Sequence, residues 1–282
     1  MESPIQMTNF AEARERELLQ GAHSYVYART PEGELQAHVF FPPEHSAVSS
    51  RVPAVVCFHG GLWDISAATQ FVPQCHELAA RGMVAVAVEY RCFQKHRTNP
   101  LDAVADARMA MGFVRENAEV LGIDVNRVVA MGAGSGAHLA ASVTLSKEGD
   151  EAELAMVRPN ALILFSAVTD VWKKGVGMDL FPSEKEAKQA SPVHQLPQKG
   201  LPPCLLFHGR GDRVVPFEQS VRFQKMYRKK RNECELVAFS NADHAFFNFN
   251  VNQDFYRATM GSVDAFLCGL GYLEPLPEDE DY

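Results

Sequence analysis

The sequence predicts an α/β fold, with about eight strands in a mostly parallel sheet that helices cover on both faces. Short, nearly continuous apolar runs recur along the chain, as is typical of strands that are buried on both faces. Helix-length segments separate these runs, which indicates βαβ units. With 282 residues, of which 46% are hydrophobic, the chain can bury one large core, so we expect a single domain over residues 1–282. The predicted strands span residues 23–28, 35–41, 54–58, 83–88, 128–131, 161–165, 204–207 and 236–239.

The first two predicted strands should form an antiparallel hairpin, because Pro31-Glu32-Gly33 lies between them. The clearest helix is expected at 100–121, where apolar residues recur at steps of three and four. Residues 169–200 depart from the alternation of strand and helix signals and are rich in Lys, Gly, Ser and Pro. We therefore expect a minimal cap or loop insertion there, with a short helix. Residues 274–282 should form an acidic tail. The other predicted helices span 10–19, 67–81, 136–146, 217–230 and 253–266.

Charge and composition argue against some classes of binding partner. A net charge of −8 argues against binding to nucleic acid or to an anionic membrane. The sequence shows neither an apolar run long enough to cross a bilayer nor a secretory signal, so we expect a cytoplasmic protein. The six cysteines are scattered without a CxxC pair, and we expect free thiols. Histidines and acids show no metal-binding spacing, so we predict no metal and no cofactor. The sequence leaves a homodimer open.

One stretch organises the chain, residues 127–140, which read RVVAMGAGSGAHLA. It predicts a buried strand, a tight glycine turn and a helix of small residues, which is the form of a nucleophile elbow. The central residue of such an elbow has a positive φ, and glycines two positions before and after it keep side chains out of the turn. Here Gly132 and Gly136 flank the turn, so the central residue is Gly134 and not Ser135.

Other chemical groups follow strands that should end at the same edge of the sheet. The third strand leads into His59-Gly60-Gly61-Leu62-Trp63, whose consecutive backbone amides suit an oxyanion hole. Asp212 follows the seventh strand and His244 follows the eighth. Active groups of open α/β sheets gather at the carboxyl ends of strands. The order of elbow, Asp and His is that of α/β-hydrolases.

From about residue 52 to 266 the chain resembles the α/β-hydrolase superfamily, specifically small carboxylesterases of the acetyl-xylan and feruloyl esterase group and hormone-sensitive-lipase-like esterases. The resemblance implies an α/β-hydrolase fold in which Asp212 is the triad acid and His244 the general base. It also implies a small-molecule ester as substrate. The oxyanion donors that it implies are the backbone amides of Gly61, Leu62 and Ser135.

Aromatic residues in these loops suggest where a substrate would lie. Trp63 follows the glycine turn, and Phe246 and Phe247 follow His244. Their loop positions make them candidates for the wall of an apolar acyl or aryl pocket. Core packing is the alternative for all three. His59, His138 and His208 are expected to be structural.

The sequence departs from the family pattern at the nucleophile. The family elbow reads G-x-S-x-G-G-H-L-A, which aligns its serine with Gly134. Three hypotheses follow: Ser135 acts as a shifted nucleophile, the site binds a ligand without hydrolysis, or Asp212 and His244 activate water as a dyad. If Gly134 is an engineered replacement of a serine, the native protein would use the ordinary esterase mechanism.

The expected function is hydrolysis of a carboxylic ester with a short acyl group or a carbohydrate-linked alcohol. Two alternatives stay open: a non-catalytic ligand-binding protein, and an amide hydrolase similar to arylformamidases. The second rests on Leu62, which replaces the third glycine of the commoner H-G-G-G-W form.

Overall fold

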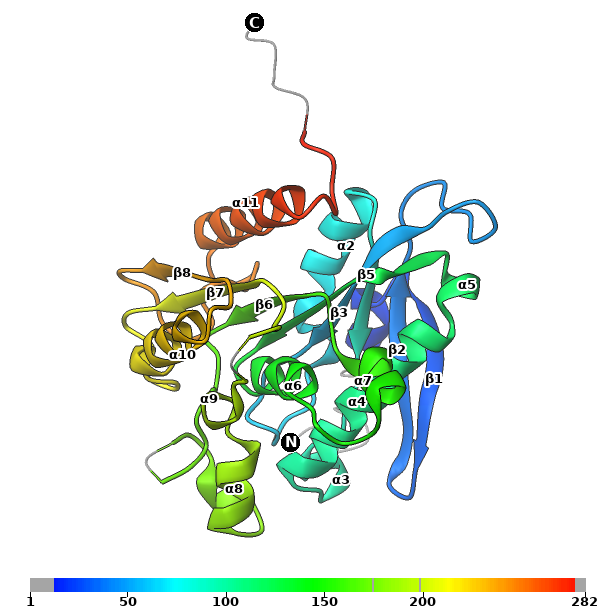
Figure 1. Cartoon of the computed structure of the whole chain (residues 1–282). Coiled ribbons are helices and arrows are strands. Elements are labelled where there is room, and N and C mark those ends of the chain that lie inside the picture. Colours follow the sequence, from blue (N-terminus) through cyan, green and yellow to red (C-terminus); the bar gives the residue numbers. More distant parts are fainter. Residues whose placement is uncertain (1–12, 174, 198, 277–282) are drawn as a thin grey trace, which may run out of the picture.

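The computed structural model describes residues 13–173, 175–197 and 199–276, and within them it shows one eight-stranded sheet (Figure 1). The strand order is β1-β2-β4-β3-β5-β6-β7-β8. β1 pairs antiparallel with β2, β2 pairs antiparallel with β4, and all later pairs are parallel. The predicted fold class is therefore confirmed. The strands are β1 (His23–Thr30), β2 (Gly33–Phe40), β3 (Val52–Phe58), β4 (Val84–Val88), β5 (Ile123–Ala133), β6 (Ala161–Phe165), β7 (Cys204–Gly209) and β8 (Cys234–Phe239).

Helices cover both faces of this sheet (Figure 1). Alternate strand residues point to opposite faces, so Val56 of β3 packs in one hydrophobic cluster and Val55 in the other. The Val56 face carries α4 (Pro100–Glu116), α6 (Ser135–Thr144) and α10 (Phe217–Lys229). The Val55 face carries α2 (Val72–Ala80) and α11 (Gln253–Gly269). This double coverage explains why the central strands read as continuous apolar runs.

Some predicted helices have different boundaries. The helix predicted at 100–121 is divided at Asn117, whose side-chain amide donates to the carbonyl of Phe113 over 2.8 Å, and α5 (Ala118–Leu121) follows. The helix predicted at 67–81 begins as a 3-10 turn, η1 (Ala68–Phe71). Two short helices outside residues 169–200 were not predicted, α3 (Phe93–His96) and α7 (Glu151–Val157), and the described part of residues 169–200 contains two short α-helices where one was predicted.

The segment from 169 to 200 forms a small appendage at the end of the sheet where the parallel strands finish. It contains η2 (Met178–Leu180), α8 (Glu184–Ala190) and α9 (Pro192–Gln195), and Figure 1 shows α8 projecting away from the sheet. Nε2 of His138 on α6 lies 2.8 Å from the carbonyl oxygen of Ala190, which ties the appendage to the elbow helix.

The ends of the chain are described only in part. Residues 13–18 are helical, whereas 10–12 of the predicted N-terminal helix and 277–282 of the predicted tail lie outside the described residues. Among the helices that are described, none combines the length and the apolar character needed to cross a bilayer. The six cysteines form no disulfide.

Candidate active site

The elbow between β5 and α6 has the backbone that the sequence predicts. Gly134 has a φ of 53° and a ψ of −112°, a region in which residues with side chains are strained. A Cβ on Gly132 would lie 2.3 Å from the carbonyl oxygen of Gly136. A Cβ on Gly136 would lie 2.0 Å from the carbonyl oxygen of Phe58. Both flanking glycines are therefore required by close backbone contacts, and Gly134 is the central residue of the turn.

The side-chain direction at Gly134 faces His244. A Cβ built on Gly134 would lie 3.1 Å from Nε2 of His244 and 3.4 Å from its Cε1. On the other side of the ring, Nδ1 lies 2.9 Å from Oδ2 of Asp212. Because a carboxylate only accepts hydrogen bonds, the proton of a neutral imidazole lies on Nδ1 here. Nε2 then presents its lone pair toward position 134, as a general base requires.

Asp212 is held by a complete set of donors. Its side chain is fully buried, and Oδ1 accepts from the backbone amides of Val214 and Val215 over 2.9 and 2.8 Å. Oδ2 lies 2.9 Å from His244 and 3.2 Å from Nε2 of His208. Burial alone raises the pKa of the Asp212 carboxyl, but hydrogen bonds from His208, His244 and Val215 outweigh it and hold the pKa well below its ordinary value. Asp212 is thus ionised at neutral pH.

The loop that carries His244 is fixed by groups that the sequence did not single out. Ser166 follows β6 with a φ of 43°, and its hydroxyl donates to the carbonyl of His244 over 3.1 Å. Asp243 accepts from the backbone amide of His244 over 2.8 Å and forms an ion pair with Arg213. The only sequence signal for Ser166 is its place directly after a buried strand.

The glycine turn after β3 lies against the elbow. A Cβ on Gly60 would lie 3.4 Å from the carbonyl oxygen of Ala133, and one on Gly61 would lie 2.4 Å from the carbonyl oxygen of Ile65. Gly61 and Leu62 both have positive φ, at 119° and 52°. Among the described residues, the backbone amides of Gly61 and Leu62 find no acceptor. These two amides are free to bind an oxygen of a ligand.

Ser135 is the first residue of α6, and its hydroxyl contacts Tyr90 and forms no hydrogen bond with His244. The residue is fully buried, and its Oγ lies 3.4 Å from the hydroxyl of Tyr90. The Tyr90 hydroxyl donates to the carbonyl of His59 over 2.8 Å, and the two rings stack with centroids 4.1 Å apart. The structure therefore brings together Gly134, His244 and Asp212, and leaves the Ser135 hydroxyl beside Tyr90.

The aromatic residues predicted as a pocket wall lie mainly in the core. Trp63 is 2% exposed and packs against His138 and Phe181. Phe247 is 1% exposed between Phe71 and Phe165, so its ring supports the sheet instead of lining a pocket. Phe246 is also buried, but it borders a cavity of about 500 Å³ that His244 shares.

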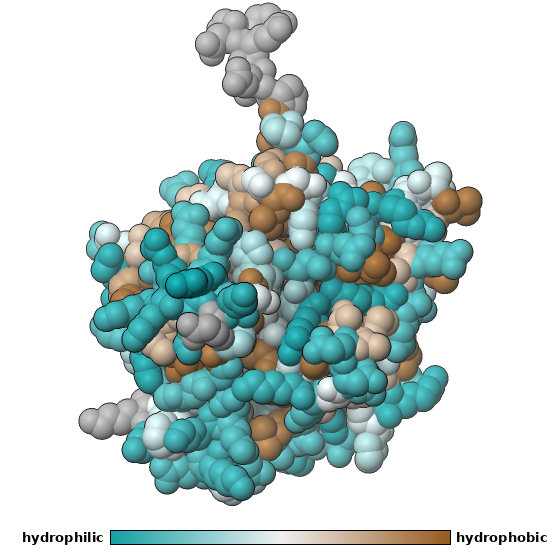
Figure 2. Space-filling model, viewed as in Figure 1, coloured by the Kyte–Doolittle hydropathy of each residue, from teal (hydrophilic) through white to brown (hydrophobic). Residues whose placement is uncertain are grey.

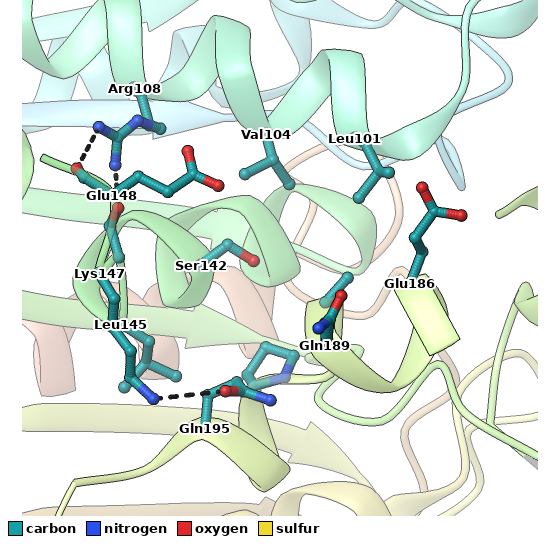
Figure 3. A pocket seen from close by; sticks show the side chains of 13 residues that line it. Leu101, Val104, Arg108, Ser142, Leu145, Lys147, Glu148, Glu186, Gln189 and Gln195 are labelled. Carbon is teal, nitrogen blue, oxygen red and sulfur yellow. Dashed lines mark hydrogen bonds between the residues drawn. The ribbon is translucent and has the colours of Figure 1, made fainter. Parts of the chain in front are cut away.

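Another cavity, of about 380 Å³, lies away from these residues. Its walls come from α4, the end of α6, α8 and α9, and side chains such as Leu101, Val104 and Gln189 point into it (Figure 3). Arg108 and Lys147 are engaged at its rim, with Glu148 and Gln195 respectively. None of the predicted site residues lines it. The face shown in Figure 2 is mostly hydrophilic, with apolar residues in small separate groups.

No set of residues in the described part of the chain gathers three His, Cys, Asp or Glu side chains as metal ligands. The chemistry that the geometry offers is that of a buried acid, a histidine base and free amides at the carboxyl ends of the strands. An elbow, an acid and a histidine in this chain order define an α/β-hydrolase. The chain belongs to the BD-FAE family, whose model matches residues 39–227.

Solved structures support this assignment. Apo Thermogutta terrifontis esterase 2 is 36% identical, with a TM-score of 0.84, over 92% of this chain and 98% of that one. The same esterase with bound propionate is 35% identical, with a TM-score of 0.83.

Curated relatives are more distant. Isoprenylcysteine alpha-carbonyl methylesterase ICME of Arabidopsis thaliana is 28% identical, over 78% of this chain and 56% of its own length. Acetylxylan esterase of Xylanibacter ruminicola is 26% identical, over 80% of this chain and 47% of its own length. The chain thus spans about half the length of these two relatives.

Proposed function

We propose that the protein hydrolyses short-acyl carboxylic esters by direct attack of water, with His244 as the general base. The observation that carries this proposal is at Gly134, where a Cβ would lie 3.1 Å from Nε2 of His244. A serine hydroxyl at that position would be the nucleophile of an ordinary esterase. In the proposed mechanism a water molecule, in place of a serine hydroxyl, lies beside Nε2 of His244.

The proposed reaction needs no covalent intermediate. Nε2 of His244 removes a proton from the water as its oxygen forms a bond to the ester carbonyl carbon. The resulting oxyanion accepts hydrogen bonds from the backbone amides of Gly61, Leu62 and Ser135. The C–O bond to the alcohol then breaks, and His244 returns the proton to the leaving oxygen. The products are the carboxylic acid and the alcohol.

Asp212 and Ser135 have supporting roles in this proposal. Asp212 keeps the proton of His244 on Nδ1 and stabilises the imidazolium that forms during attack. Ser135 contributes its backbone amide, because its hydroxyl is buried beside Tyr90. A shifted nucleophile at Ser135 would need its side chain to turn toward His244.

The substrate class rests on relatives. The structural relatives include a propionate-bound and a butyrate-bound form of Thermogutta terrifontis esterase 2, and the curated relatives include a methylesterase and an acetylxylan esterase. A short acyl group is therefore the substrate feature that we propose for this chain.

The test is steady-state hydrolysis of p-nitrophenyl acetate and butyrate. The protein should release p-nitrophenol slowly and linearly from the first turnover, and His244→Ala should lose this activity. Ser135→Ala should keep turnover within about threefold, because it retains the backbone amide. Ser142→Ala, on the same helix α6, is the matched control for a hydroxyl removed elsewhere. A rate that does not differ between the protein and His244→Ala would overturn the proposal.

A second candidate, favoured by the same glycine, is a protein that binds esters or carboxylates without hydrolysing them. Loss of the hydroxyl removes covalent catalysis but leaves the free amides of Gly61 and Leu62. Calorimetric binding of butyrate, combined with no His244-dependent turnover, would select this function.

A further inference from the structure

We propose that His208 is a positioning residue that acts through Asp212. It donates Nε2–H to the carboxylate oxygen that holds His244, and thereby limits how tightly His244 keeps a proton. This inference rests on the proposed role of His244 as the general base. It adds a second histidine to the Asp212–His244 pair.

The geometry fixes which nitrogen of His208 carries the proton. Nε2 lies 3.0 Å from the carbonyl oxygen of Val215 and 3.2 Å from Oδ2 of Asp212, and both of these atoms can only accept. Nδ1 lies 2.7 Å from the hydroxyl of Ser220 on α10, which can donate to it. A neutral ring with its proton on Nε2 matches these neighbours, with the one N–H shared between the carbonyl of Val215 and Oδ2 of Asp212. The His208 ring is fully buried, so water cannot replace these contacts.

The two histidines share one oxygen of Asp212. Nδ1 of His244 and Nε2 of His208 lie 2.9 and 3.2 Å from Oδ2, while Oδ1 is occupied by the amides of Val214 and Val215. A carboxylate that accepts from several donors has its negative charge spread among them. His208 therefore reduces the charge that Asp212 offers to His244.

The other charges near His244 do not duplicate this effect. Asp243 binds the backbone amide of His244 and not its ring, and the Arg213 guanidinium pairs with it. Asp212 is thus the carboxylate that faces the imidazole, and His208 is the second side chain that shares it. Without His208, more of the charge of Asp212 would face the His244 ring, and protonated His244 would be better stabilised. Such a histidine cannot accept a proton from water.

The test is an NMR titration of the full-length protein labelled with ¹³C at the histidine Cε1 position, with the His244 signal assigned from His244→Ala. In His208→Leu the titration midpoint of His244 should rise by about half to one pH unit. His208→Gln keeps an N–H donor and should stay within about 0.2 pH unit of the unsubstituted protein. His38→Leu removes a buried histidine from β2 and is the matched control, with no shift expected.

Two results would overturn the inference: an unchanged midpoint in folded His208→Leu, or an equal rise in His208→Gln. If His208→Leu does not fold, His208→Met provides the same loss of a donor with a more adaptable side chain. The titration requires no substrate, so absence of ester hydrolysis would refute the proposed function and leave this measurement intact.

Discussion

A Cβ on Gly134 would lie 3.1 Å from Nε2 of His244, so the elbow position that faces this nitrogen carries no side chain. The surrounding parts of an ester hydrolase are present. Asp212 holds Nδ1 of the same ring, and free amides lie on the neighbouring loop. In the proposed mechanism the chain therefore differs from an ordinary serine esterase at the nucleophile position, Gly134, and keeps His244 as the base.

A side chain at position 134 should lower stability. Gly134→Ala and Gly134→Ser should each reduce the free energy of unfolding by about 1–3 kcal/mol, because the backbone there is strained for any residue with a Cβ. Urea unfolding followed by circular dichroism measures this. Equal stability of Gly134→Ala and the unsubstituted protein would show that the elbow is relaxed and would contradict the prediction.

A side chain at the flanking position, Gly136, should lower stability further. In Gly136→Ala the new Cβ would lie 2.0 Å from the carbonyl oxygen of Phe58 and 2.2 Å from that of His59, both in the backbone. We expect a loss of about 3 kcal/mol or more, or no folded protein. Gly112→Ala in α4 is the control, because nothing lies within 4 Å of its Cβ, and it should raise stability by about 0.5–1 kcal/mol. Thermal unfolding compares the two, and a loss below 1 kcal/mol in Gly136→Ala would argue against the elbow geometry.

Two buried histidines should make stability depend on pH. Burial lowers the pKa of His59 to about 4 and that of His138 to about 4, whereas an unfolded histidine has a pKa of about 6.5. The unfolded state therefore binds more protons between these values. Their contribution is complete above about pH 6.5 and is lost as the pH falls toward 4, at up to about 1.4 kcal/mol per pH unit for each histidine.

Urea unfolding between pH 4 and pH 8 measures this dependence. His138→Gln can still donate to the carbonyl of Ala190 but cannot titrate, so it should have a shallower slope below about pH 6.5. An unchanged slope in His138→Gln would mean that His138 is protonated in the folded state.

The sequence predicted most of the fold because the signals were local. Continuous apolar runs marked six of the strands, and Pro31-Glu32-Gly33 marked the hairpin formed by the other two. The position of β4 between β2 and β3 depends on pairing across the sheet, which no local pattern reports. The break at Asn117 was missed because the apolar stripe continues past a helix end that a side-chain amide closes.

The sequence predicted the candidate site only where the spacing of residues along the chain determines the backbone conformation. The three glycines of the elbow identified Gly134 as its central residue, and the backbone angles agree. The direction of the Ser135 hydroxyl depends on Tyr90, which is distant in the sequence. The burial of Phe247 depends in the same way on Phe71 and Phe165. His208 was predicted to be structural, because a histidine directly after a buried strand favours a hydrogen bond to loop backbone, and its contact with Asp212 depends on the tertiary fold.

Hydrolysis without a covalent acyl-enzyme can be tested by intact-protein mass spectrometry of samples quenched during reaction with p-nitrophenyl acetate. The unsubstituted protein should turn the ester over without carrying an acetyl group, whereas Gly134→Ser should accumulate one acetyl group, which peptide mapping places at position 134. An acetyl group on Ser135 of the unsubstituted protein, or no acetylation of folded Gly134→Ser, would contradict the account.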